Sequence, residues 1–343
     1  MDPDFVDFND YEDDIPPQQT KSSNQNFMSS WFYKIFGFDE TNDINYCKSK
    51  IIQKMNNFKI VSNGSLFDEL VLLNKGKVTF DNIVISTKEL YSNKVMSTNA
   101  IFQVETNADF KNNEHDQCIK LADYTNEQMK YTPHESAHLI YELNNADTLD
   151  SFFNYVKTYD NTIQYEIQNG VLMFPNSDEL AKVKSVLMYS TTRRRDARRK
   201  LQNLYYKFCT TIIDNIKINN NICQVYCYAL PINVQNYDND LWKGLVELFL
   251  EAMYENTLYI ANKYNEENNC NATCYLVSLG EQYGISSAQV ARAIQRACQI
   301  ASSKNIKLDV KLVHKVHNYD NCYDELSKSY PLNHVDVASV WDS

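Results

Sequence analysis

Glycine is the residue that this sequence most clearly lacks. The chain has 7 glycines among 343 residues, whereas an average protein has about 7% glycine, or roughly 24 in a chain of this length. Loops that hold phosphate groups are usually built from glycine, because a residue without a side chain lets backbone N–H groups approach the ligand closely. A phosphate site is therefore restricted to the few segments that contain glycine.

Cationic residues are also in the minority. Lys and Arg together number 33 against 44 Asp and Glu, which gives a formal net charge of -11. A chain that repels phosphate as a whole is a poor candidate for general nucleic-acid binding, so we expect no nucleic-acid partner.

Long apolar runs are absent as well. No stretch approaches about 18 consecutive apolar residues, so we expect no membrane span. The sequence begins with acidic residues rather than with the basic and apolar residues of a secretory leader, and its 9 cysteines are an odd number. These features predict reduced thiols and a cytoplasmic location. We expect no cofactor.

The composition divides the chain into four segments. Residues 1–26 form an acidic tail that we expect to be disordered, because it has too little apolar surface to offset the entropy of ordering. Residues 27–98 are predicted to form a helix and a β-rich extension, residues 99–325 the core, and residues 326–343 a C-terminal tail. The acidic tail and Trp341 are candidates for binding a protein partner.

The last third of the chain alternates between strand and helix patterns. The patterns predict strands at 224–230, 274–279 and 308–313, and helices at 241–264 and 287–303. This order predicts a parallel sheet with helices packed on it. Because ligands of such sheets bind beyond the carboxyl ends of the strands, the loops after Leu230 and Leu279 are the first candidate sites.

His134, Glu135 and His138 form the sharpest short motif, His-Glu-Ser-Ala-His. On a helix, two histidines four residues apart share a face and can bind zinc, with the glutamate as general base. Pro133 would place this motif at the start of its helix rather than within it. Surface histidines on that helix are the simpler interpretation, and a zinc hydrolase is the alternative.

Two other clusters have both structural and functional interpretations. Cys223, Cys227, Cys270 and Cys274 have spacings that resemble a metal site, but buried cysteine is also a common small core residue. The run 193–200 holds six cations, against the sign of the whole chain. It fits a solvated helix face, a local anion site, or a docking surface for an acidic segment, including the chain's own N-terminal tail.

The loop from Gly280 to Gly284 lies between a predicted buried strand and a helix. A phosphate there would meet free backbone N–H groups and the positive end of the helix dipole, although Glu281 adds a negative charge.

The run from Gln224 to Val313 resembles a macro domain, an α/β/α module that binds ADP-ribose. Residues 225–231 resemble the strand before its long helix, 250–258 resemble that helix, and 275–284 resemble the strand and glycine loop that hold the diphosphate. Residues 100–107 resemble the first ligand strand, which ends in an asparagine.

A divergent branch of such proteins also resembles this chain. That branch has an N-terminal Trp-Phe helix like Trp31-Phe32, and a Thr-Gln-Gly-Pro-like segment where Thr132 to Glu135 stand here. The resemblance implies that Asn107 contacts the distal ribose, that Gly280 and Gly284 line the diphosphate, that Tyr283 packs on the proximal ribose, and that Thr132 belongs to the site.

The sequence departs from the family pattern at each of these loops. Residues 105–109 contain no glycine, Glu281 and Gln282 replace small residues, and the segment at 132–134 lacks the glycine of its counterpart. Each change puts carbon or negative charge where a pyrophosphate would lie, and a buried unpaired charge costs several kcal/mol.

The sequence therefore predicts a three-layer α/β/α, macro-domain-like mixed sheet with an N-terminal β-rich extension. The predicted function is binding of ADP-ribose or a related nucleotide, with Glu105 or Glu135 as candidate general bases if hydrolysis follows. The alternatives are a non-catalytic interaction protein with a degenerate pocket, and the zinc hydrolase through His134 and His138.

Overall fold

The structure is a computed structural model. It describes residues 37–39, 44–53, 58–60, 78–84, 99–105, 148–168, 171–206, 209–212, 222–227, 229–230, 240–281, 284–314 and 319–328. Seven cysteines in these ranges are free thiols: Cys47, Cys223, Cys227, Cys270, Cys274, Cys298 and Cys322. None of the helices in these ranges is both long and apolar enough to cross a membrane.

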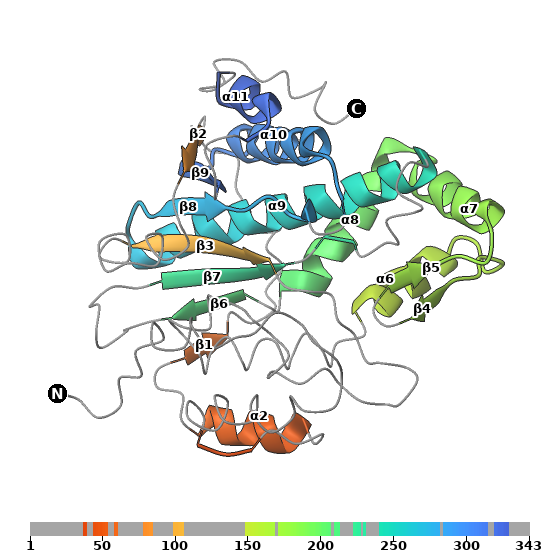
Figure 1. Cartoon of the computed structure of the whole chain (residues 1–343), viewed down its shortest axis with the longest axis horizontal. Helices are drawn as coiled ribbons and strands as arrows, with labels where there is room; N and C mark the ends of the chain where they lie inside the picture. Colours follow the sequence, from red (N-terminus) through yellow and green to blue (C-terminus); the bar gives the residue numbers. More distant parts are fainter. Residues whose placement is uncertain are drawn as a thin grey trace, which may run out of the picture.

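A seven-stranded sheet forms the centre of the molecule (Figure 1). In spatial order it comprises β1 (Phe58–Ile60), β6 (Cys209–Ile212), β7 (Ile222–Cys227), β3 (Ala100–Glu105), β8 (Thr273–Leu276), β9 (Leu308–His314) and β2 (Val78–Val84). The last five strands are mutually parallel, whereas β1 and β6 add an antiparallel pair at one edge. The predicted α/β class and the mixed sheet are therefore confirmed, while the likeness to a macro domain stays a prediction.

Both described strands of the predicted N-terminal extension belong to this sheet. β1 lies at one edge and β2 at the other, where it pairs with β9 over seven residues. Asp309 on β9 accepts hydrogen bonds from Thr79 on β2 and from Thr273 on β8, each at 3.0 Å. One carboxylate thus joins three neighbouring strands.

Two long helices cover the sheet. α9 (Asp240–Asn268) contacts β7, β8 and β9, and α10 (Ser287–Ser303) packs along α9. The side chain of Ser286 caps α10 by accepting from the N–H of Gln289. On the central strand β3, Gln103 donates to Thr257 of α9 at 2.8 Å, so alternate residues of β3 face this helix.

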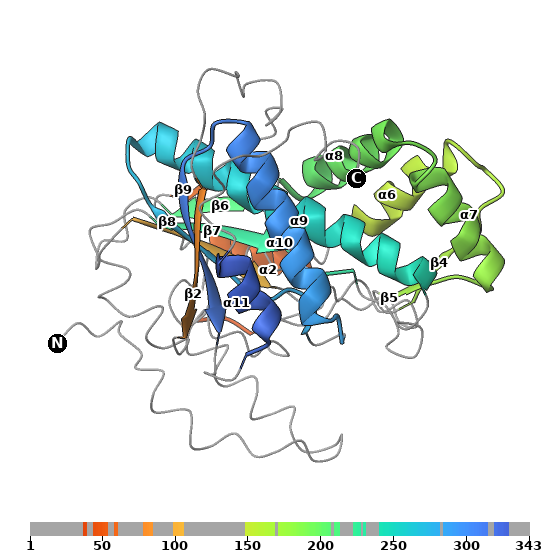
Figure 2. The same ribbon diagram turned by 90° about the horizontal axis from the view of Figure 1, so that it is seen from above.

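A helical unit stands to one side of the sheet in both views (Figures 1 and 2). It contains α6 (Thr148–Lys157), α7 (Ser177–Leu187), α8 (Thr191–Tyr206) and the hairpin of β4 (Glu166–Gln168) and β5 (Val171–Met173). Phe152 of α6 makes an edge-to-face contact with Phe249 of α9, with ring centroids 5.3 Å apart. The helix α9 therefore belongs to both the sheet layer and this helical unit.

Two short helices complete the described structure. These are α2 (Ile44–Ile52), which buries Cys47 and Ile51, and α11 (Asn321–Lys328). An aromatic cluster holds α11 against β9. The ring centroid of His314 lies 5.1 Å from that of Tyr323 in α11, and the His314 ring stacks on Tyr319, which precedes the helix, with centroids 3.9 Å apart. Asn82 of β2 donates to the carbonyl of Tyr323, so its side-chain oxygen accepts from Nε2–H of His314 at 3.0 Å.

The environment of His314 predicts a pH effect on stability. Burial lowers its pKa below the ordinary 6.5, although Asp324 opposes this shift. The unfolded chain then binds a proton at higher pH than the folded chain does, so stability falls as the pH drops through about 6.5. Melting temperatures at pH 7.5, 6.5 and 5.5 should therefore decline less steeply for His314→Gln than for the unchanged protein. If the melting temperatures of the two proteins declined equally, His314 would not be the source of the pH effect.

Candidate functional site

The candidate site is the carboxyl edge of the adjacent parallel strands β3 and β8, whose following connections lead to opposite sides of the sheet. After β3, the next parallel strand in the sequence is β7, which lies on the side of β3 away from β8. After β8, the chain continues through α10 to β9, on the side away from β3. Connections that leave two adjacent parallel strands in opposite directions mark the point where α/β sheets bind ligands.

The two strands also separate at this edge. β3 pairs with β7 over six residues but with β8 only from Ala100 to Phe102. Beyond Phe102, side chains of β3 replace the backbone pairing. Gln103 accepts a hydrogen bond from the N–H of Val277 at 3.2 Å, and Glu105 reaches the loop that follows.

Glu105 makes the contact that defines the site. Its Oε1 accepts a hydrogen bond from the backbone N–H of Gly280 at 2.6 Å. This distance is short for an N–H···O bond. The amide of Gly280 thus has a side-chain carboxyl oxygen of the same chain as its acceptor.

Gly280 itself is required by the geometry. Its φ is +83°, in the left-handed region. A side-chain Cβ at this position would lie 2.8 Å from the Cβ of Ala229 and would overlap the side chain of Ile285. The turn closes on itself through a bond from the N–H of Ile285 to the carbonyl of Gly280 at 3.2 Å. The loop is therefore packed against its surroundings at Gly280.

Tyr254 of α9 holds the start of the same loop. Its hydroxyl donates to the carbonyl of Val277 at 2.9 Å and accepts from the N–H of Leu279 at 3.0 Å. Burial raises the pKa of this hydroxyl well above its ordinary value, so it stays protonated. Burial also raises the pKa of the nearby Cys227 thiol, so this thiol stays protonated at neutral pH.

The residues predicted from the sequence divide into two groups. Glu105 and Gly280 are in contact, and Gly284 lies in the same loop, where its N–H donates to the carbonyl of Glu281 at 3.1 Å. The other predicted residues lie outside the described ranges: Asn107, Thr132, His134, Glu135, His138, Tyr283 and Trp341. The sequence did not predict that Gln103 and Tyr254 belong to the site. For Gln103, the only indication was its polar amide inside the apolar run 100–104.

The described part of the chain contains no group of three or more His, Cys, Asp or Glu residues placed to hold a metal ion. Of the cysteine quartet, Cys223, Cys227 and Cys274 are buried in strands and Cys270 is half-buried. Cys223, Cys227 and Cys274 belong to the hydrophobic core, and Cys270 packs against it.

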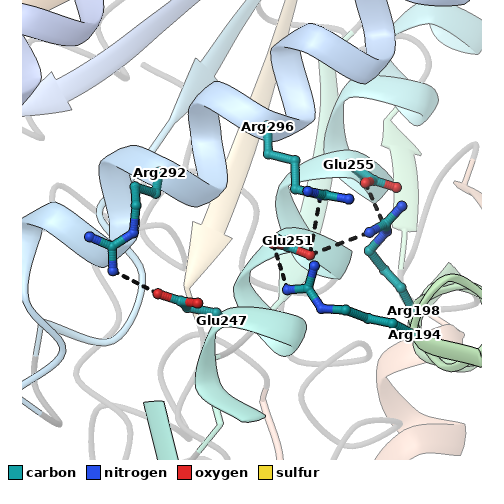
Figure 3. Close-up of polar contacts among 7 residues, drawn as sticks. All are labelled: Arg194, Arg198, Glu247, Glu251, Glu255, Arg292 and Arg296. Atoms are coloured by element: carbon teal, nitrogen blue, oxygen red, sulfur yellow. Dashed lines mark hydrogen bonds and ion pairs between the residues drawn. The ribbon is translucent and has the colours of Figure 1, made fainter. Parts of the chain in front are cut away.

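The basic run on α8 is not simply a solvated helix face. Arg194 donates to Oε1 of Glu251 at 2.9 Å, and Arg198 lies 3.4 Å from Oε2 of the same carboxylate (Figure 3). Arg198 also contacts Glu255 at 2.9 Å, and Arg296 of α10 approaches Glu251 at 3.5 Å. Because the two glutamates belong to α9, this ion-pair network joins the helical unit to the sheet layer.

No protein-family model, no curated protein and no solved structure matches this chain.

Proposed function

We propose that this protein binds ADP-ribose or a related nucleotide at the carboxyl edge of β3 and β8. The observation that carries the proposal is the bond from the Gly280 amide to Glu105, located where the two strands separate. A backbone N–H that holds a carboxylate has the chemistry that a diphosphate oxygen requires.

Glu105 would then act as a competitor built into the site. A diphosphate and a carboxylate cannot share one amide, and like charges about 5 Å apart repel by roughly 3 kcal/mol at an effective dielectric constant of 20. Nucleotide binding therefore requires Glu105 to turn away from Gly280. This requirement supplies the test.

Isothermal titration calorimetry with ADP-ribose tests the proposal. It compares the unchanged protein with the variants Glu105→Gln and Glu281→Gln. Glutamine keeps an acceptor for the Gly280 amide but removes the charge, so Glu105→Gln should increase the affinity about tenfold, equivalent to about 1.4 kcal/mol. Glu281 is the matched control, because it belongs to the same loop but is exposed. Its replacement should change the affinity less. Chromatography of the nucleotide afterwards detects hydrolysis.

The second candidate is a non-catalytic interaction protein with a degenerate pocket. The observation that favours it is that the described N–H groups of Val277, Leu279, Gly280, Gly284 and Ile285 all have partners within the protein. If ADP-ribose gives no heat with the unchanged protein, with Glu105→Gln or with Glu105→Ala, this candidate replaces the first.

A further inference from the structure

The basic run of α8 has a second, outward side that the ion-pair network does not use. The guanidinium carbon of Arg193 lies 4.5 Å from the ring centroid of Tyr159 and 4.6 Å from that of Tyr189. Both rings are open to solvent, with Tyr159 44% exposed and Tyr189 75% exposed. Among the described residues, no carboxylate lies within ion-pair distance of Arg193.

This arrangement leaves the arginine ready to bind an anion. A guanidinium whose faces contact aromatic rings keeps its N–H edge available for a carboxylate. Next to it, the hydroxyls of Tyr155 and Tyr159 are 3.1 Å apart, and Nζ of Lys200 lies 6.0 Å from the Tyr155 ring centroid. We call these five residues, Tyr155, Tyr159, Tyr189, Arg193 and Lys200, the tyrosine–arginine surface.

The surface carries a local positive charge on a chain whose net charge is -11. Arg195 adds a further cation, which is 3.6 Å from the exposed Asp196. Exposed tyrosines beside an arginine are typical of the residues that dominate protein interfaces. An acidic peptide that also contains aromatic residues would match both properties of this surface.

The chain contains such a peptide at its N-terminus. Residues 2–14 include no Lys or Arg, and their acidic and aromatic residues are Asp2, Asp4, Phe5, Asp7, Phe8, Asp10, Tyr11, Glu12, Asp13 and Asp14. The residues from 15 to 36 separate this peptide from the first described residue, and fully extended they span about 75 Å. A folded chain of this length has a radius of gyration of about 20 Å, so the extended segment is longer than the folded part is wide.

We propose that residues 2–14 dock on the tyrosine–arginine surface of their own chain. The carboxylates pair with Arg193 and Lys200, and the aromatic side chains pack on Tyr159 and Tyr189. This proposal does not depend on the nucleotide site, which is built from different elements.

Zero-length carbodiimide cross-linking of the full chain, followed by mass spectrometry, tests the docking. The reagent joins a carboxylate to an amine in direct contact, so we expect cross-links between residues 2–14 and Lys200 within one chain. Arg193→Glu and Tyr189→Ser should each lower their yield about tenfold, as expected for residues central to an interface. Raising the salt concentration to about 1 M should lower the yield as well.

Arg292→Ala is the matched control, because Arg292 is an exposed arginine on α10. Its cross-linking yield should equal that of the unchanged protein. Three outcomes would each overturn the proposal. The first is an unchanged yield in both Arg193→Glu and Tyr189→Ser, and the second is cross-linking of residues 2–14 only to other lysines. The third is cross-linking only in a dimer band that increases with protein concentration.

Discussion

Replacing Glu251 by alanine is expected to lower the free energy of unfolding by about 3–5 kcal/mol. Glu251 accepts contacts from Arg194, Arg198 and Arg296, and its side chain is only 8% exposed. The alanine variant loses both carboxylate oxygens of Glu251 while the three arginines remain. One of them, Arg198, is buried, with a side chain only 3% exposed. Breaking a buried ion pair from one side is costly because the remaining charge stays out of water.

Glu247 is the matched control for this prediction. It lies one turn earlier on α9 and also pairs with an arginine of α10, Arg292, at 2.6 Å. That arginine is 60% exposed, so water can replace its partner and Glu247→Ala should cost less than about 1 kcal/mol. Urea denaturation of the two variants measures the difference. Equal losses would show that the network around Glu251 does not hold the helical unit on the sheet layer.

Replacing Gly280 by alanine should also destabilise the fold, by about 2–5 kcal/mol. The left-handed backbone costs a side-chain-bearing residue about 1–2 kcal/mol, and forcing a methyl group against Ala229 and Ile285 adds about 1–3 kcal/mol. Because Gly280 donates to Glu105, the same variant should also disturb the candidate site.

Replacing Gly244 of α9 by alanine should have the opposite effect on stability. A Cβ there would have Met188 as its nearest neighbour at 3.8 Å, an ordinary contact distance. Alanine in a helix loses less backbone entropy than glycine on folding, so Gly244→Ala should stabilise the protein by about 0.5–1 kcal/mol. Guanidinium denaturation of both variants checks the pair, and destabilisation by Gly244→Ala would contradict the helical assignment of that position.

The elements that the sequence predicted well are those with a strong local pattern. The helix predicted at 287–303 has those bounds in the structure, because its apolar residues recur at helical spacing behind the Ser286 cap. The strand at 308–314 alternates buried and half-buried residues as a strand with one covered face should. In contrast, α8 has so many charged residues that no apolar stripe identified its buried side.

The order of the strands could not be predicted from local patterns. The strand and helix patterns after residue 224 suggested consecutive strands, yet β3 lies between β7 and β8. That insertion depends on packing between segments more than 100 residues apart in the sequence. For the same reason, Glu105 and Gly280 were each candidate site residues, but their contact follows only from the adjacency of β3 and β8.

The pairing of β2 with β9 has a consequence for synthesis of the protein. Val78 is aligned with Leu308, so one edge of the sheet cannot close until the segment that contains Leu308 has left the ribosome. At about 5–20 residues per second, the delay between the two segments is about 10–50 seconds. During that time Val78 and Phe80, both buried in the finished fold, have no partner strand. We therefore expect newly made chains to depend on a chaperone until β9 emerges.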